Sequence, residues 1–177
     1  GGLYVSSANT GDITLSNSKV YQNECVNKGG AANIQDDYTL IEGTLIYNNS
    51  SQGDGGGIYT SGKLKMVNST LAANTVPSGR NGSGIMVETG LDSSLLVNNI
   101  FYNTGDGIYK TNGKLVAYNN YFCEADVDLD IIRGSGNTFS DVDPFVDGDN
   151  FNYVLENTSD LIGSGIASTV FYGKTFN

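Results

Sequence analysis

Two short sequence elements alternate along most of the chain, and this repetition constrains the fold more than any other feature. The first is a glycine pair or near-pair followed by apolar residues, at 1–5, 29–34, 56–59, 82–87 and 105–109. The second is an apolar anchor accompanied by asparagine, with anchors at Val20, Leu45, Leu71, Phe101 and Phe122. The anchors are 25, 26, 30 and 21 residues apart, a period typical of solenoids.

Each repeat holds short β-type runs, such as 95–97 and 115–117, broken by Gly, Asn and Ser. No segment shows sustained helical periodicity. One coil cannot bury its own apolar face, so successive coils must stack, at about 4.8 Å per rung. The repeats therefore predict an all-β fold, a parallel β-helix of about six coils. An antiparallel sandwich is the rival, but it needs tight turns every 8–12 residues and no uniform long period.

The composition agrees with stacked coils. Glycine (24) and asparagine (21) together make up about a quarter of the 177 residues. Glycine supplies corners with positive φ, and asparagine tolerates the left-handed region and can bond to the asparagine of the next rung. The 11 Tyr and 7 Phe argue against disorder.

Charge excludes several classes of partner. Nine Lys and Arg against 19 Asp and Glu give a net charge of −10, with no basic patch for nucleic acid or anionic lipid. No apolar run is long enough to span a bilayer. Histidine is absent, so serine and cysteine triads and most zinc sites lose their commonest member.

Two stretches resemble known families. The elements at 56–59 and 68–74 resemble the repeats of polymorphic outer-membrane proteins, a likeness that covers roughly 1–123. The motifs at 143–147, 150–155 and 159–165 resemble the closing coils of the pectin-lyase-like superfamily. The resemblance implies a right-handed coil, an extracellular or cell-surface location, and a role in adhesion or polysaccharide contact.

These observations divide the chain into two parts. Residues 1–165 are expected to form the β-helix, with repeat coils over 1–123 and closing coils over 124–165. Residues 166–177 carry an apolar run at 170–172 and are expected to cap the last rung or to bridge to a neighbour. The chain begins at a glycine element with no polar cap, so an open first rung is expected, which predicts head-to-tail self-association as one alternative.

An acidic stretch is the candidate metal site. Asp126, Asp128 and Asp130 alternate along one predicted strand, and alternating carboxylates on one face suit calcium. Four further aspartates follow, at 141, 143, 147 and 149. The alternative is a solvated acidic face with turn-forming Asp, and Asp143 before Pro144 is expected to form a turn. Apart from calcium, no cofactor is expected.

Three tyrosines are the candidate ligand-binding residues. Tyr21, Tyr47 and Tyr102 each follow an anchor by one or two places, so they are expected to form an outward ladder. Such a ladder suits carbohydrate or protein binding. The alternative is that ring stacking between rungs only stabilises the β-helix.

Cysteines and sequons add two further expectations. Cys25 and Cys123 would lie about four rungs, or ~19 Å, apart, which excludes an intramolecular disulfide. Each is therefore expected to be a small buried hydrophobe or to pair between molecules.

Five glycosylation sequons give weak support for an extracellular location; they start at Asn48, Asn49, Asn68, Asn81 and Asn157.

The sequence thus predicts a non-catalytic adhesin-type module that binds glycan or protein, or builds a cell-surface assembly. One alternative is a fibre subunit that stacks head to tail. The other is a polysaccharide lyase or hydrolase, for which Arg133, close to the acidic stretch, is the best candidate base.

Overall fold

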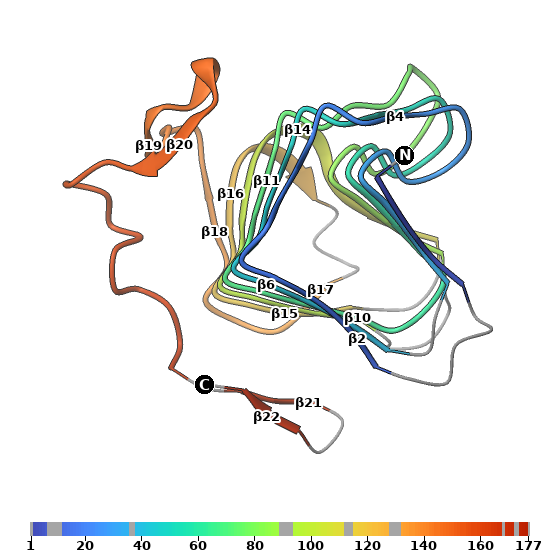
Figure 1. Ribbon diagram of the computed structural model, residues 1–177. Helices are drawn as coiled ribbons and strands as arrows, with labels where there is room; N and C mark the ends of the chain where they lie inside the picture. The colour runs from blue at the N-terminus through green and yellow to red at the C-terminus, as the bar shows by residue number, and fades with distance from the viewer. Residues whose placement is uncertain are drawn as a thin grey trace.

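The structure is a computed structural model in which the chain winds as a right-handed parallel β-helix (Figure 1). Each winding contributes one strand to each of three faces, and all pairings between windings are parallel. The predicted fold class is confirmed. The structure describes residues 2–6, 12–35, 38–88, 94–111, 115–127, 132–167, 169–171 and 174–176.

The strands fall into three stacked rows. The first face consists of β1 (Leu3–Val5), β5 (Ala32–Ile34), β9 (Ile58–Thr60), β12 (Ile85–Val87) and the later parts of β14 (Ile100–Lys110) and β16 (Tyr121–Val127). The second, a six-stranded sheet, consists of β2 (Ile13–Ser16), β6 (Thr39–Glu42), β10 (Leu64–Val67), β13 (Leu95–Val97), β15 (Leu115–Tyr118) and β17 (Ile132–Arg133). The third consists of β3 (Lys19–Tyr21), β7 (Leu45–Tyr47), β11 (Thr70–Ala72), the starts of β14 and β16, and β18 (Thr138–Ser140). Short strands β4 (Glu24–Cys25) and β8 (Ser50–Ser51) pair beside them.

The interior is filled by columns of apolar side chains, one residue per rung. On the third face the column is Val20, Ile46, Leu71, Phe101, Phe122 and Phe139. The rings of Phe101 and Phe122 stack at 4.8 Å, and those of Phe122 and Phe139 at 5.0 Å. Four of the five predicted anchors lie in this column. At the second repeat the interior residue is Ile46, the neighbour of the predicted Leu45, because two adjacent apolar residues hide the in–out alternation.

In each turn of the solenoid, two corners bound the third face. At each corner two consecutive residues have different roles. The first residue takes the left-handed conformation, as in Asn48 (φ 52°) and Asn98 (φ 55°). The second points inward and bonds to its counterpart one rung away. The expectation that one asparagine would do both is therefore corrected, since a side chain on a left-handed corner points away from the core.

The first corner, between the second and third faces, carries the longer inward ladder. Asn99 Nδ2 donates to Asn120 Oδ1, and Asn120 Nδ2 donates to Asn137 Oδ1, both at 3.0 Å. Ser69 and Thr44 continue the ladder toward the N-terminus through backbone N–H to side-chain oxygen bonds. At the second corner the same role falls to three asparagines, Asn23, Asn49 and Asn74.

The glycine element is explained by close approach of neighbouring rungs. A Cβ on Gly30 would lie 2.1 Å from the carbonyl oxygen of Gly56, and one on Gly84 would lie 2.2 Å from that of Gly107. Both contacts are with backbone, which cannot move aside cheaply. Glycine is therefore required where one coil passes against the next.

Within the range 124–165, where closing coils are expected, the chain forms rungs up to Ser140 and leaves the solenoid beyond it. Asp143 Oδ1 accepts the N–H of Phe145 at 2.8 Å, so Asp143 forms the expected turn. The chain then forms an antiparallel hairpin from β19 (Phe145–Asp147), the short 3-10 helix η2 (Gly148–Asn150) and β20 (Asn152–Leu155). This hairpin packs on the outer side of the third face (Figure 1).

The tail forms a second hairpin, β21 (Thr169–Phe171) with β22 (Lys174–Phe176), where a single capping or bridging strand was expected over 166–177. Ile166 packs against Val67, Leu95 and Val97 on the outer side of the second face. The segment that enters this hairpin thus runs along the outside of the solenoid.

Candidate functional site

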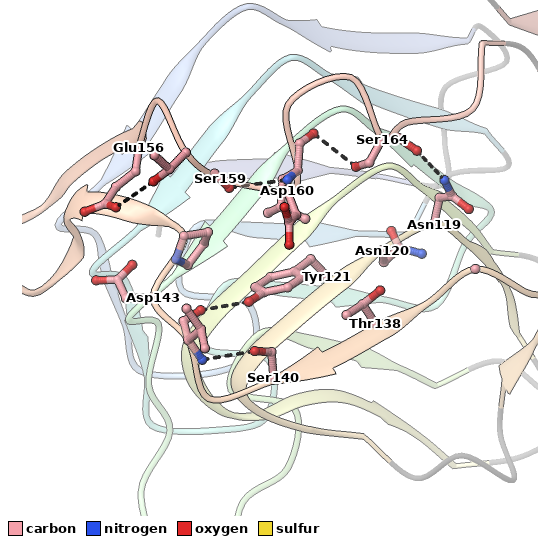
Figure 2. Close-up of a pocket in the computed structure, with 15 residues that line it drawn as sticks. Asn119, Asn120, Tyr121, Thr138, Ser140, Asp143, Glu156, Ser159, Asp160 and Ser164 are labelled. Atoms are coloured by element: carbon pink, nitrogen blue, oxygen red, sulfur yellow. Dashed lines mark hydrogen bonds between the residues drawn. The ribbon is translucent and has the colours of Figure 1, made fainter.

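A cleft lies between the first corner and the segment 156–166, which we call the strap. It comprises two adjoining hollows of about 460 Å³ and 360 Å³. Four residues line both hollows: Asn119, Tyr121, Leu161 and Ser164. We therefore treat the two hollows as one cleft, of which Figure 2 shows the larger part.

The floor of the cleft is a row of residues from successive rungs of the third face. Thr70, Ile100, Tyr121 and Thr138 are in register on β11, β14, β16 and β18. All four line one or both hollows. Because each rung contributes one residue, the floor runs parallel to the solenoid axis.

The outward asparagines of the first corner hold the strap in place. Asn98 makes a two-point contact: its Nδ2 donates to Ile166 O, and its Oδ1 accepts the N–H of Ile166, both at 3.0 Å. One rung further, Asn119 Nδ2 donates to Ser164 O at 2.8 Å (Figure 2). The residues that look like simple turn formers in the sequence therefore also anchor a segment far along the chain.

The cleft walls are polar and acidic. Hydroxyl groups come from Thr138, Ser140 and Ser159, and carboxylates come from Asp143, Glu156 and Asp160. In Figure 2 the Asp160 side chain points toward the ring of Tyr121, whose hydroxyl donates to Val142 O at 2.8 Å. Neither hollow has Lys or Arg among the described residues that line it. A cationic or neutral ligand suits these walls, and an anionic one does not.

The three predicted tyrosines have different environments. Tyr21 and Tyr47 stack at 5.0 Å on the outer side of the third face, and Tyr21 is 46% exposed. Ala72 occupies the next position in register and interrupts the ladder before Tyr102. Tyr47 contacts Tyr153 of the hairpin edge-on at 5.4 Å.

Tyr102 lies under the hairpin, so it is corrected as a ligand-binding candidate. It is 4% exposed, and its ring meets Phe145 edge-on at 5.4 Å. Its hydroxyl is shared between Asp143 Oδ2 at 3.0 Å and Asp149 Oδ1 at 3.1 Å. Burial, reinforced by these carboxylates, raises the pKa of Tyr102 above its ordinary value. Sequence alternation correctly places this residue outward but cannot indicate what covers it.

The acidic stretch is only partly described. Asp126 is exposed on β16, in register with Asp106 of β14, whereas Asp128 and Asp130 lie outside the described residues. Over the described ranges, no group of three or more His, Cys, Asp or Glu side chains comes together as a metal site. The side chain of Arg133, on β17, also lies outside the description.

The soft sulfur donors are scattered. Cys25 is partly buried in the first winding, and Cys123 is 1% exposed under the hairpin, with both thiols free. Burial first, then Glu124, Asp143 and Asp141, raises the pKa of Cys123 to about 11. A thiol covered by the hairpin cannot reach a second molecule, so Cys123 is corrected as a partner in an intermolecular disulfide. Met66 and Met86 are both buried.

The sequons also divide by burial. Asn49 is 1% exposed, and its Nδ2 donates to Asn74 Oδ1 and to two backbone carbonyls. Its amide is therefore not accessible to a glycosyltransferase in the folded chain, which corrects it as a glycosylation site. Asn48 and Asn81 are partly exposed, and Asn68 and Asn157 are exposed.

Comparison with known proteins gives one family. The sequence model of NosD, described as "Periplasmic copper-binding protein (NosD)", matches residues 1–153. Neither the curated proteins nor the solved structures contain a match to the chain. In the described part of the chain, no helix is long and apolar enough to cross a membrane. Since the family match covers most of the 177 residues, the chain belongs to the NosD family.

Proposed function

We propose that this chain is a non-catalytic β-helical binding module of the cell envelope, and that its cleft binds a hydroxyl-rich glycan. The observation that carries the proposal is the cleft itself, whose walls present hydroxyl, amide and carboxylate groups around Tyr121. Sugar hydroxyls need many donors and acceptors placed on a rigid frame, and an aromatic ring offers a face for stacking. The stacked rungs supply such a frame.

Charge narrows the class of glycan. Asp143, Glu156 and Asp160 line the larger hollow, and the whole chain carries a net charge of −10. Asp143 is already engaged with Tyr102 and Phe145, which leaves Glu156 and Asp160 as the exposed acids of the strap. A neutral or amino-bearing sugar chain complements this cleft, whereas uronate or phosphate groups would be repelled.

An envelope location supports the proposal. The family is described as periplasmic, and the likeness of the repeats to surface adhesins favours a chain that meets cell-wall or surface glycans. We extend the proposal to an extracellular or cell-surface location. Protein binding through the same cleft is the alternative.

Copper, which the family description names, does not fit the residues present. Copper is held by imidazole, thiolate and thioether ligands, and the chain contains no histidine. Cys25 and Cys123 lie four windings apart, and the Cys123 thiol is buried. Met66 lies in the apolar interior on the second face. Met66 and Met86 are both buried, and no cluster of three or more His, Cys, Asp or Glu side chains forms among the described residues.

We therefore expect the isolated chain to bind no stoichiometric copper. After exposure to Cu(II), or to Cu(I) under reductant, and then to a competing chelator, elemental analysis should give well below one copper per chain. A Cys25→Ala variant controls for adventitious binding at the more exposed thiol. One copper per chain that survives the chelator would contradict this assignment.

The glycan proposal is tested with a matched pair of ligands that differ in charge. Calorimetric titration should show binding of a glucosamine oligomer, weaker binding of its N-acetylated counterpart, and none of an oligogalacturonate. Asp160→Asn should lower the affinity for the glucosamine oligomer about two- to fivefold, as expected for the loss of a partly exposed ion pair. Asp126→Asn, which removes the same charge outside the cleft, should have no effect. Failure of every oligomer to bind, or preference for the uronate, would overturn the proposal.

A further inference from the structure

The two hollows define a direction for the ligand. The in-register floor from Thr70 to Thr138 crosses three rung spacings, about 14 Å at ~4.8 Å each. Ile100 and Tyr121 lie between these ends and give the floor an apolar middle. A chain laid along this floor contacts one equivalent position per rung. The cleft therefore suits an extended, linear ligand parallel to the solenoid axis.

The strap crosses this floor as a separate unit. At its start, the N–H of Glu156 donates to Pro144 O at 3.0 Å. Within it, the described hydrogen bonds of 157–163 are internal, with Ser159 N–H donating to Glu156 O at 2.9 Å and Ile162 N–H donating to Ser159 O at 3.1 Å. The side chain of Ile162 is exposed. The hydrogen bonds that join the strap to the solenoid lie at the far end of the strap, where Asn98 and Asn119 contact its backbone.

From this arrangement we infer that the strap is a clamp, latched by Asn98 and Asn119, that closes over a linear glycan spanning both hollows. The inference rests on the proposed function and adds the shape of the ligand and the residues that control its release. Leu161 and Ser164 of the strap line both hollows, so a chain that fills one and reaches the other lies against the same strap residues. Opening the latch breaks three hydrogen bonds and separates Ile166 from the apolar cluster of Val67, Leu95 and Val97.

The test removes the latch without straining the backbone. Asn98 and Asn119 have φ of 55° and 51°, a region that glycine adopts freely, so Asn98→Gly with Asn119→Gly deletes only the side chains. Asn48→Gly, at a left-handed corner on the other side of the third face (φ 52°), is the matched control. Thermal unfolding of all three proteins verifies that the variants fold.

Association and dissociation rates are measured for glucosamine oligomers of increasing length. For the unmodified chain, affinity should rise with length until the oligomer spans the floor and then level off. The double variant should release long oligomers about tenfold faster while leaving the shortest unchanged, because only long chains depend on the closed strap. Affinity that does not increase with length, or equally faster release of every length, would overturn the clamp alone. No binding of any oligomer would overturn the proposed function and the clamp together.

Discussion

Replacing Asn99 with alanine should lower the free energy of unfolding by about 2–5 kcal/mol, a large share of the 5–15 kcal/mol typical of a domain. Asn99 Oδ1 accepts the N–H of Ser69 at 3.0 Å. Its Nδ2 donates to Met66 O at 2.9 Å and to Asn120 Oδ1 at 3.0 Å. All of these groups are buried, so alanine leaves polar atoms without partners where water cannot replace them.

Urea-induced unfolding measures this effect, with Asn48→Gly as the control. Asn48 is an outward corner asparagine, so its loss should change stability by no more than about 0.5 kcal/mol. The contrast between inward and outward asparagines is the important result. An Asn99→Ala variant within 1 kcal/mol of the parent would show that the ladder does not stabilise the fold.

The second large effect is expected at Phe122, the middle ring of the interior stack. Its neighbours Phe101 and Phe139 lie at centroid distances of 4.8 and 5.0 Å. Phe122→Ala removes both stacking contacts and leaves a cavity between rungs. The free energy of unfolding should therefore fall by about 3–5 kcal/mol. The melting temperature should fall by about 6–20 °C.

Differential scanning calorimetry provides the measurement, and Phe151 offers a matched control. Phe151 is 47% exposed on the hairpin and has φ of 64°, so asparagine can replace it without backbone strain. Phe151→Asn should shift the melting temperature by only a few degrees. A similar shift for both variants would contradict the assignment of Phe122 to the core.

The repeat was sufficient to predict the solenoid because both of its elements report physical constraints of stacked coils. Glycine marks the sites of rung-to-rung contact, as at Gly30, and the apolar anchor marks the interior column. At the second repeat the inward residue is Ile46 instead of the predicted Leu45, because two adjacent apolar residues do not show which of them faces the core.

The C-terminal third could not be predicted in the same way. Residues 145–155 pair locally and antiparallel, and a strand pair of this length carries no signal that separates a hairpin from a coil. The cleft depends on contacts such as Asn98 with Ile166, which join positions 68 residues apart. An asparagine at a left-handed corner has the same sequence signature whether or not its side chain holds another segment.

The most direct test of the binding cleft is a two-dimensional NMR titration of the labelled chain with the glucosamine oligomer. Binding in the cleft should give shifts confined to it, including the side-chain amides of Asn98 and Asn119 and the backbone of 156–166. The amides of the inward ladder at Asn23 and Asn49 should not move. Shifts centred on another face of the solenoid, or none at saturating ligand, would contradict the account.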